Sequence, residues 1–492
     1  MKRWSVHWVD DHPIDFSIPQ DAFCSVDYFL ERELECGIRH LSPFMADPNL
    51  VIDARLTGYF NSHKFRRLAP ATKKSYLADY RVFFDFLWMR DKIWDQVTSD
   101  DIEDFEDWRR RAPDNPRKIG GSKWMRELAA LNVLYKWAFQ KGHLDVSPLL
   151  TQIVMLRTGQ SVEKLDVSAR DVRSSNVKWV TPRAFHVWRD IGILGYGSDG
   201  LPDEGWRGRN GDRNAAFTDL LFDSGLRLTE GATLFTLELP VLEYGRKNQW
   251  SMLAAAVSKS RRTRSFTMRT STLQEIHTYI ATTRRSAIRR AQSGGRYDGV
   301  IGKRVVLSVG TPPNRTITWA DENGIENTAR LDSLPAAERQ KFYLETDGAL
   351  EPLCLWLSEA GMPFESHSWE NVYNAANKRL RDIRGDSAIF FTPHMARHSF
   401  ALYMLVVVMH AMDKRYGLTP EERRDFRLLY GDPWRIVQVL LGHASVETTR
   451  NIYLAPVEDV QIRTLLEGAE DNGAEFLAAL AEVSNRVQDI VE

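Results

Sequence analysis

Between residues 70 and 142, apolar residues recur three and four positions apart, which is the spacing of one face of an α-helix. Three such stretches follow one another. The first begins after Thr72, a plausible N-cap, the second after the capping and acidic residues 98–101, and the third ends near Gly142. Their apolar positions are Tyr76, Tyr80, Phe83, Phe84, Leu87, Ile102, Phe105, Trp108, Trp124, Leu128, Leu131, Leu134, Tyr135 and Ala138. The pattern predicts a small all-helical domain over residues 53–165 with the aromatic stripes in its core.

A second, longer domain is predicted over residues 181–460, after a polar linker at 166–180. The apolar run 217–222 predicts a helix that stops at Gly225, and residues 229–237 restart one. Val257, Phe266 and Met268 flank a polar, basic turn, which favours a two-stranded antiparallel hairpin. Further helices are predicted over residues 367–384, 395–412, 420–430, 434–441 and 446–454.

Three segments do not fit this pattern. Residues 1–52 have no clear period and are assigned only as an N-terminal extension, and residues 310–350, with glycines, prolines and few periodic positions, are interpreted as an insertion. Residues 461–492 are predicted to be a C-terminal helical tail, whose apolar stripe must be buried against its own domain or a neighbouring subunit. The stripe consists of Phe476, Leu480, Val483, Val487 and Ile490. The predicted fold class is mainly α with a small antiparallel β-hairpin or sheet, that is, α+β.

The bulk composition indicates an ordinary globular protein of two or three domains, with 492 residues, 43% hydrophobic and 27% charged. Cys24, Cys36 and Cys354 show neither metal-ligand spacing nor a disulfide framework, which favours a reduced, cytoplasmic compartment. The opening residues do not read as a secretory signal. The longest apolar run, residues 400–409, is half the roughly 20 residues needed to span a bilayer. We therefore expect no membrane association.

The net charge of −1 hides an uneven distribution. Residues 255–307 carry twelve lysines and arginines against only Glu275 and Asp298, whereas the chain after Tyr453 is acidic. A local basic surface suits a polyanion such as nucleic acid. For the arginines of residues 284–290, a solvated helix face is an equally good interpretation.

Two arginines, two histidines and a tyrosine occur in strings that together suit cleavage of a phosphodiester. Arginine matches two phosphate oxygens with a planar fork and keeps its charge, so Arg227 and Arg397 could neutralise the reacting phosphate. A tyrosine has a pKa near 10, so only about one in a thousand is ionised at pH 7, and it needs a nearby base to act as a nucleophile. His394, His443 and Tyr453 are the candidates for the remaining parts of such a site. The sequence shows no compact cluster of acids fit to hold a metal ion, so we expect neither metal nor cofactor.

These strings resemble the three signature boxes of the tyrosine recombinases, the phage-integrase family. They are residues 225–230 (Gly-Leu-Arg-Leu-Thr-Glu), 394–401 (His-Met-Ala-Arg-His-Ser-Phe-Ala) and 441–449 (Leu-Gly-His through Thr-Thr), the last followed by Tyr453. Each box is weak alone, but the three in this order make a strong signal. The resemblance covers roughly residues 55–460, and it implies that residues 53–165 are a core-binding (SAM-like) DNA-binding domain which, with the catalytic domain, clamps the duplex.

The resemblance also implies a role for each matching residue. Arg227 and Arg397 would hold the scissile phosphate, and Tyr453 would attack it to give a 3′-phosphotyrosine link and a 5′-hydroxyl. His394 would move the tyrosine's proton, His443 would hydrogen-bond the phosphate, and Lys259 of the hairpin would protonate the leaving oxygen. Glu230 and His398 would have supporting roles, His398 more through packing and hydrogen bonding than through catalysis. The basic neighbours of Lys259, namely Arg261, Arg262 and Arg264, would contact DNA.

The chain also departs from the family pattern. Ser258 replaces the usual glycine before the lysine, Ala396 stands where leucine is common, and Ala455 replaces the histidine that often follows the tyrosine. Extra residues near 410–432 and 310–350 separate the boxes. None of these changes removes a catalytic group, but they indicate a divergent, mobile-element branch whose DNA site cannot be read from the sequence.

The resemblance predicts site-specific recombination, that is, integration, excision or transposition by an integrase or transposase. It implies a homo-tetramer on paired sites in double-stranded DNA, with accessory factors possible, and a cytoplasmic, nucleoid-associated protein. Two alternatives stay open at this point. One is a nicking-closing enzyme like a type IB topoisomerase, and the other is a non-catalytic architectural DNA-binding factor.

Overall fold

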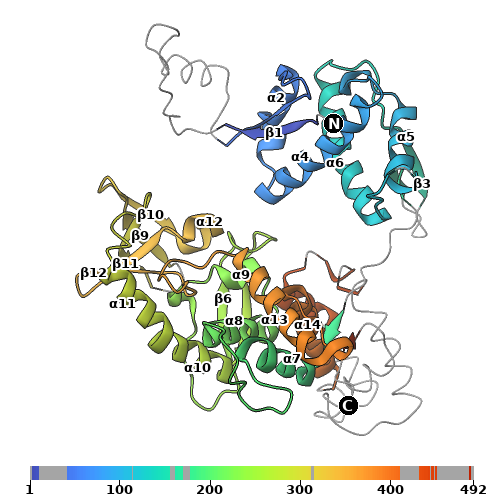
Figure 1. The fold of residues 1–492 in the computed structure, drawn as a ribbon. Helices are drawn as coiled ribbons and strands as arrows, with labels where there is room; N and C mark the ends of the chain where they lie inside the picture. The colour runs from blue at the N-terminus through green and yellow to red at the C-terminus, as the bar shows by residue number, and fades with distance from the viewer. Residues whose placement is uncertain are drawn as a thin grey trace, which may run out of the picture. The chain divides into compact units, whose positions relative to one another are not determined.

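The computed structural model describes residues 3–9, 41–113, 115–155, 161–169, 178–311, 315–410, 432–443, 445–447, 449–450 and 487–488. The chain divides into two compact units, Met1–Arg173 and Ser174–Glu492 (Figure 1). Tyr453, the predicted helix at 420–430 and most of the predicted N-terminal extension and C-terminal tail lie outside the described residues.

The three helices predicted for the first unit are confirmed: α4 (Pro70–Trp88), α5 (Ser99–Arg110) and α6 (Gly121–Gln140). Thr98 caps α5 in a reciprocal capping box with Asp101. Helix α4 begins before Thr72, since Pro70 occupies its first position, which suits a residue that lacks an N–H. The other elements of the unit are β1 (Ser5–Trp8), β2 (Pro43–Ala46), α2 (Ala54–Phe60), α3 (His63–Arg66), the 3₁₀ turn η1 (Trp94–Gln96), β3 (Thr151–Met155) and β4 (Ser161–Leu165).

The aromatic stripes of these helices form the core of the first unit, as predicted. Tyr80, Phe83, Phe105 and Trp124 are completely buried in one cluster. The segment before residue 53 contributes to the same core, because Trp4 packs in it and the strands β1 and β2 pair antiparallel beside α2 and α4. The hairpin β3–β4 was not anticipated.

The second unit begins with β5 (Trp179–Val180), α7 (Pro182–Arg189), a π-helical turn η2 (Asp190–Leu194) and α8 (Gly211–Ser224). Helix α8 stops at Gly225, as predicted, and α9 (Leu228–Ala232) follows with a 3₁₀ turn η3 (Thr236–Glu238). The predicted hairpin is present: β6 (Asn248–Leu253) pairs antiparallel with β7 (Arg264–Arg269), and residues 254–263 form the loop between them.

Residues 304–352 form a five-stranded sheet, in the region where the sequence indicated an insertion but no elements. Its order is β10-β9-β8-β11-β12, with β8 and β11 parallel and the other neighbours antiparallel. Figure 1 shows this inserted sheet at the opposite end of the unit from α7 and α14. The elements are α10 (Thr270–Tyr279), η4 (Ile280–Arg284), α11 (Arg285–Ser293), β8 (Arg304–Val309), β9 (Thr316–Ala320), β10 (Glu326–Arg330), η5 (Leu331–Ser333), α12 (Ala336–Arg339), β11 (Phe342–Thr346) and β12 (Ala349–Pro352).

The later predicted helices within the described ranges are confirmed as α13 (Ser368–Arg384), α14 (Pro393–His410) and α16 (Pro433–Leu441), with a 3₁₀ turn η6 (Gly385–Ser387) after α13. Two expectations are corrected. The strand β13 (Val487–Gln488) lies where a helix was predicted, and it pairs parallel with β5, which lies within the predicted linker. The backbone pairing with β5 is a tertiary contact, and here it outweighs the helical spacing of the apolar residues.

The fold class α+β is confirmed by these elements. Among the described helices, none is long and apolar enough to cross a membrane.

Candidate active site

Arg397 joins three segments that are far apart in the sequence. It lies near the start of α14 and is only 2% exposed. Its Nη1 donates a hydrogen bond to the carbonyl oxygen of Gly225 at 2.6 Å, and its Nη2 donates to that of Leu441 at 2.5 Å. The strings 225–230, 394–401 and 441–449 therefore meet at one guanidinium.

The close approach of the first two strings requires glycine at position 225. Gly225 has a φ of 62°, in the left-handed region, and a Cβ added to it would lie 2.3 Å from Cδ1 of Phe400. Phe400 belongs to the second string and packs with Trp179 and Leu441 in a small apolar cluster. The end of α8 is thus pressed against α14, which sets the position of Arg227 two residues later.

Glu230 holds two arginines in this site. The carboxylate is 1% exposed, its Oε1 accepts from Arg227 Nη1 at 2.8 Å, and its Oε2 accepts from Arg264 Nη2 at 2.7 Å. Oε2 also accepts from the backbone N–H of Arg227 at 2.9 Å. Burial by itself would raise the pKa of Glu230, but Arg264 and Arg227 outweigh burial and hold this pKa below its usual value. Glu230 therefore stays ionised and fixes Arg227, whose side chain is 27% exposed.

Arg264 lies in the interior, which corrects the expectation that it contacts DNA. It is 7% exposed, and its Nη1 donates to the carbonyl oxygen of Leu440 at 2.5 Å. Gly442 packs on it so closely that an added Cβ would lie 2.8 Å from Arg264 Cδ. Together with its bond to Glu230, Arg264 links the first string to the turn that carries His443. The sequence suggested a DNA contact for Arg264 and did not indicate this linking position.

Lys259 lies in the exposed loop between β6 and β7, together with Arg261 and Arg262, which are also exposed. Ser258, which stands where the family has glycine, is buried, and its Oγ is 2.9 Å from Oγ of Ser260. The charge of Lys259 is close enough to act on the pKa of His394. All three basic side chains of this loop, Lys259 included, are open to solvent.

Three histidines lie around the arginines. The rings of His394 and His398 are 4.2 Å apart, and Nδ1 of His443 is 3.0 Å from Oγ1 of Thr449. Burial first, and then the neighbouring positive charges, lowers the pKa of all three: to about 4 for His443, to about 3 for His398, and below the usual value for His394. All three are therefore neutral near pH 7, the state in which a histidine can accept a proton.

These shifts predict a loss of stability in mild acid. The pKa of a histidine in the unfolded chain is near 6.5, so below that pH the unfolded state binds protons that the folded state excludes, and stability falls as the pH drops from 6.5 toward about 4. For His398 alone the expected loss between pH 7.5 and 5.5 is about 1.4 kcal/mol. Urea unfolding at the two pH values measures this loss. In His398→Asn, the decrease in the free energy of unfolding between the two pH values should be smaller by the contribution of His398. The same substitution at exposed His367 is the control and should leave the pH dependence as it is.

Within the described ranges, no three or more His, Cys, Asp or Glu side chains are grouped so that they could hold a metal ion. Tyr453 lies outside these ranges, so its place relative to Arg227 and Arg397 stays a prediction.

Comparisons with known proteins point to one family. Residues 59–142 match the phage integrase N-terminal SAM-like domain. This match lies outside the strings of the second unit, so the resemblance to phage integrases is confirmed by a separate part of the chain. A search of curated proteins found no match.

Several solved structures are similar to this chain over most of its length. They include a Tn1549 transposon integrase in complex with transposon right end DNA, at 13% identity over 86% of this chain and 98% of that one, with a TM-score of 0.44. XerA recombinase matches at 16% identity over 83% and 95% of the two chains, with a TM-score of 0.30. XerH recombinase bound to a palindromic difH substrate matches at 11% identity over 85% and 86%, with a TM-score of 0.43. At such scores the overlaps alone say nothing about activity.

Proposed function

We propose that this chain is a site-specific tyrosine recombinase, an integrase or transposase that cleaves and rejoins double-stranded DNA through a 3′-phosphotyrosine at Tyr453. The observation that carries the proposal is the convergence on Arg397 of the strings that hold Arg227, His394 and His443. A buried guanidinium held by two carbonyl oxygens is pre-organised, and a fixed cation is the main need of a phosphoryl-transfer site.

In the proposed reaction, the phenolic oxygen of Tyr453 bonds to phosphorus as the bond from phosphorus to the 5′-oxygen breaks. His394, neutral because burial and Arg397 lower its pKa, takes the phenolic proton. Lys259 gives a proton to the leaving 5′-oxygen. The 5′-hydroxyl of a partner strand then reverses these steps and releases Tyr453.

The remaining groups hold the phosphate. Arg227 and Arg397 neutralise its non-bridging oxygens, and His443 donates a hydrogen bond to it. Glu230 orients Arg227, and His398 packs against His394. The positive charge that the reacting phosphate needs thus comes from side chains of this chain.

The partners follow from the same proposal. Residues 53–165 would act as the core-binding domain, and together with the catalytic domain they would enclose the duplex, with Arg261 and Arg262 on the DNA. The active unit would be a homo-tetramer on paired sites, with accessory factors, at the nucleoid.

Tyr453→Phe tests the proposal, because it removes the one oxygen that can form the covalent bond. On a nicked duplex drawn from the DNA that flanks the gene, the unaltered protein should form an adduct that survives denaturing gel electrophoresis, and Tyr453→Phe should form none. Tyr244→Phe, at a side chain that is 90% exposed, is the matched control and should keep full adduct formation.

An adduct that persists in Tyr453→Phe would overturn the proposed nucleophile. Recombination between two cognate sites, measured with the same unaltered protein, then separates strand exchange from nicking and closing alone.

A further inference from the structure

The inserted sheet, residues 304–352, has a buried arginine among its attachments to the rest of its unit. Arg339 at the end of α12 is 0% exposed, and each of its five N–H donors has an acceptor. On the side of the catalytic residues, Nη1 donates to the carbonyl of Thr233 at 3.1 Å, and Nη1 and Nη2 donate to the carboxylate of Glu238 at 2.6 and 3.0 Å. On the side of the insertion, Nε donates to Leu334 O at 3.2 Å and Nη2 to Leu331 O at 3.4 Å.

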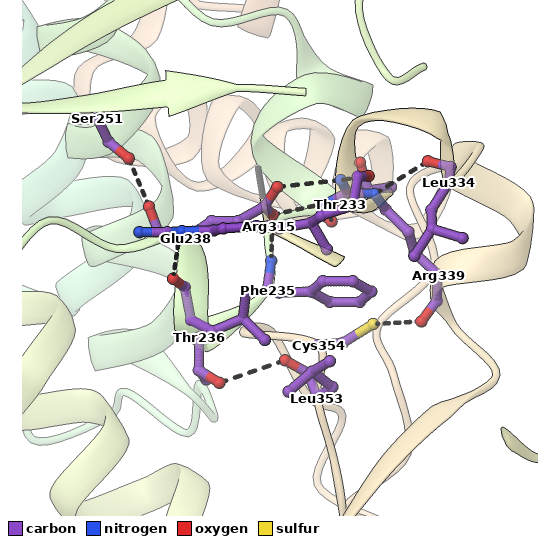
Figure 2. Close-up of polar contacts among 12 residues, drawn as sticks. Thr233, Phe235, Thr236, Glu238, Ser251, Arg315, Leu334, Arg339, Leu353 and Cys354 are labelled. Carbon is purple, nitrogen blue, oxygen red and sulfur yellow. Dashed lines mark hydrogen bonds and ion pairs between the residues drawn. The ribbon is translucent and has the colours of Figure 1, made fainter. Parts of the chain in front are cut away.

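Figure 2 shows how this attachment continues toward the hairpin. The carboxylate of Glu238 accepts from the backbone N–H of Phe235 at 2.9 Å, and the guanidinium of Arg339 lies over the Phe235 ring, 4.6 Å from its centre. The carbonyl of Glu238 accepts from Ser251 Oγ of β6 at 2.5 Å. Thr233 is the C-cap of α9, the helix that begins after Arg227. One guanidinium therefore connects the inserted sheet to β6 of the hairpin and to α9.

The insertion also contacts the loop that carries Lys259. The carbonyl of Asp332 accepts from the backbone N–H of Ala256 at 2.9 Å, and Oδ2 of Asp332 accepts from Oγ1 of Thr263 at 3.3 Å. Lys259 lies between these two points along the chain. Asp332 itself lies in η5, between Leu331 and Leu334, the two residues of the insertion whose carbonyl groups Arg339 binds. Arg339 thus binds the turn η5, and Asp332 of that turn binds the loop on both sides of Lys259.

We propose that the inserted sheet positions Lys259 for proton transfer, with Arg339 and Asp332 as positioning residues. The inference rests on the proposed function, in which Lys259 protonates the leaving 5′-oxygen. A general acid contributes about 10²–10⁴-fold in rate, but only when it is held within hydrogen-bond reach of the leaving atom. Lys259 is on an exposed loop, so that placement depends on what fastens the loop.

The test compares two leaving groups. On a duplex with a 5′-oxygen at the scissile bond, Arg339→Met should slow adduct formation by about tenfold or more, part of the full contribution of a general acid. On the same duplex with a 5′-bridging sulfur, the variant should react within about threefold of the unaltered protein, because a thiolate, with a thiol pKa near 8.5, leaves without being protonated. In a Lys259→Ala background, Arg339→Met should cause no further loss. Arg304→Met is the matched control, because Arg304 pairs with Glu338 inside the insertion, and it should behave as the unaltered protein on both duplexes.

The outcomes separate the two levels of inference. If the unaltered protein forms no adduct on either duplex, the proposed function is wrong. If the unaltered protein forms the adduct, and Arg339→Met slows adduct formation equally on both duplexes, the arginine is merely structural and the positioning role is wrong. Should Arg339→Met fail to fold, the double variant Asp332→Ala/Thr263→Val decides, because it removes only the side-chain bond to the loop. On the oxygen duplex the double variant should form the adduct about threefold more slowly, which is the effect of one modest hydrogen bond. On the sulfur duplex its rate should be unchanged. If the double variant slows adduct formation by the same factor on both duplexes, the positioning role is wrong.

Discussion

Arg397→Lys is expected to slow covalent adduct formation by about 10³-fold or more while the protein stays folded. An arginine that neutralises a transferring phosphoryl group contributes about 10³–10⁵ in rate. Arg397 is held by two carbonyl oxygens, one from each of two separate segments. A lysine keeps the charge but is a point charge without a planar fork, so it cannot donate to both carbonyls and present the same face to the phosphate.

Single-turnover adduct formation on the nicked duplex measures this effect. The matched control is Arg381→Lys, on the exposed surface of α13, which should react as the unaltered protein does. The far-ultraviolet circular dichroism of both variants should be unchanged. Adduct formation by Arg397→Lys within tenfold of the unaltered protein would show that Arg397 does not bind the reacting phosphate.

Arg264→Met is expected to have the second largest effect, and the loss should appear in stability as well as in rate. Removal of one partner from a buried ion pair costs about 3–5 kcal/mol, because the other charge stays behind. Arg264 and Glu230 are 5% and 1% exposed in their side chains, so solvent screens this pair little. The variant also leaves the carbonyl of Leu440 without its donor and allows the turn of His443 to move. We expect adduct formation to fall by about a hundredfold, as when a catalytic group loses its positioning.

Salt dependence distinguishes this role from the DNA contact that the sequence suggested. Loss of one phosphate contact reduces the slope of log affinity against log salt by about one. Arg262→Met, at an exposed loop residue that we propose to lie on DNA, should reduce the slope by this amount, and Arg264→Met should leave it unchanged. A lower slope for Arg264→Met, with the midpoint of urea unfolding unchanged, would show that Arg264 contacts the DNA.

The position of Arg264 could have been recognised from the strand that contains it. Arg264, Phe266 and Met268 alternate along β7, and all three are buried. In a strand, residues two apart face the same side, so a prediction that buries Phe266 and Met268 also turns Arg264 inward. The basic run around it concealed this, because a cluster of arginines beside a turn is more often exposed.

The inserted sheet was missed for a related reason. Residues 316–320 alternate in burial, and Asn323-Gly324 follows them, a pair typical of tight hairpin turns. These signals are short, and the glycines and prolines around them suggested irregular structure. The pairing of β8 with β11 joins strands that are distant in the sequence, and no local pattern reports such a pairing.

The sequence by itself determined the helices of the first unit, the stop of α8 at Gly225 and the hairpin around Lys259, and it supplied the set of residues that we propose to cut a phosphodiester. These depend on period, caps and residue chemistry, which act over a few positions along the chain. Only the tertiary structure decided which arginines are exposed, that Arg397 ties three strings together, that Arg339 joins the inserted sheet to Glu238, and that Asp332 joins it to the lysine loop. The physical reason is that a buried charge is stable only where distant segments supply its partners, so its place depends on the packing of the whole domain.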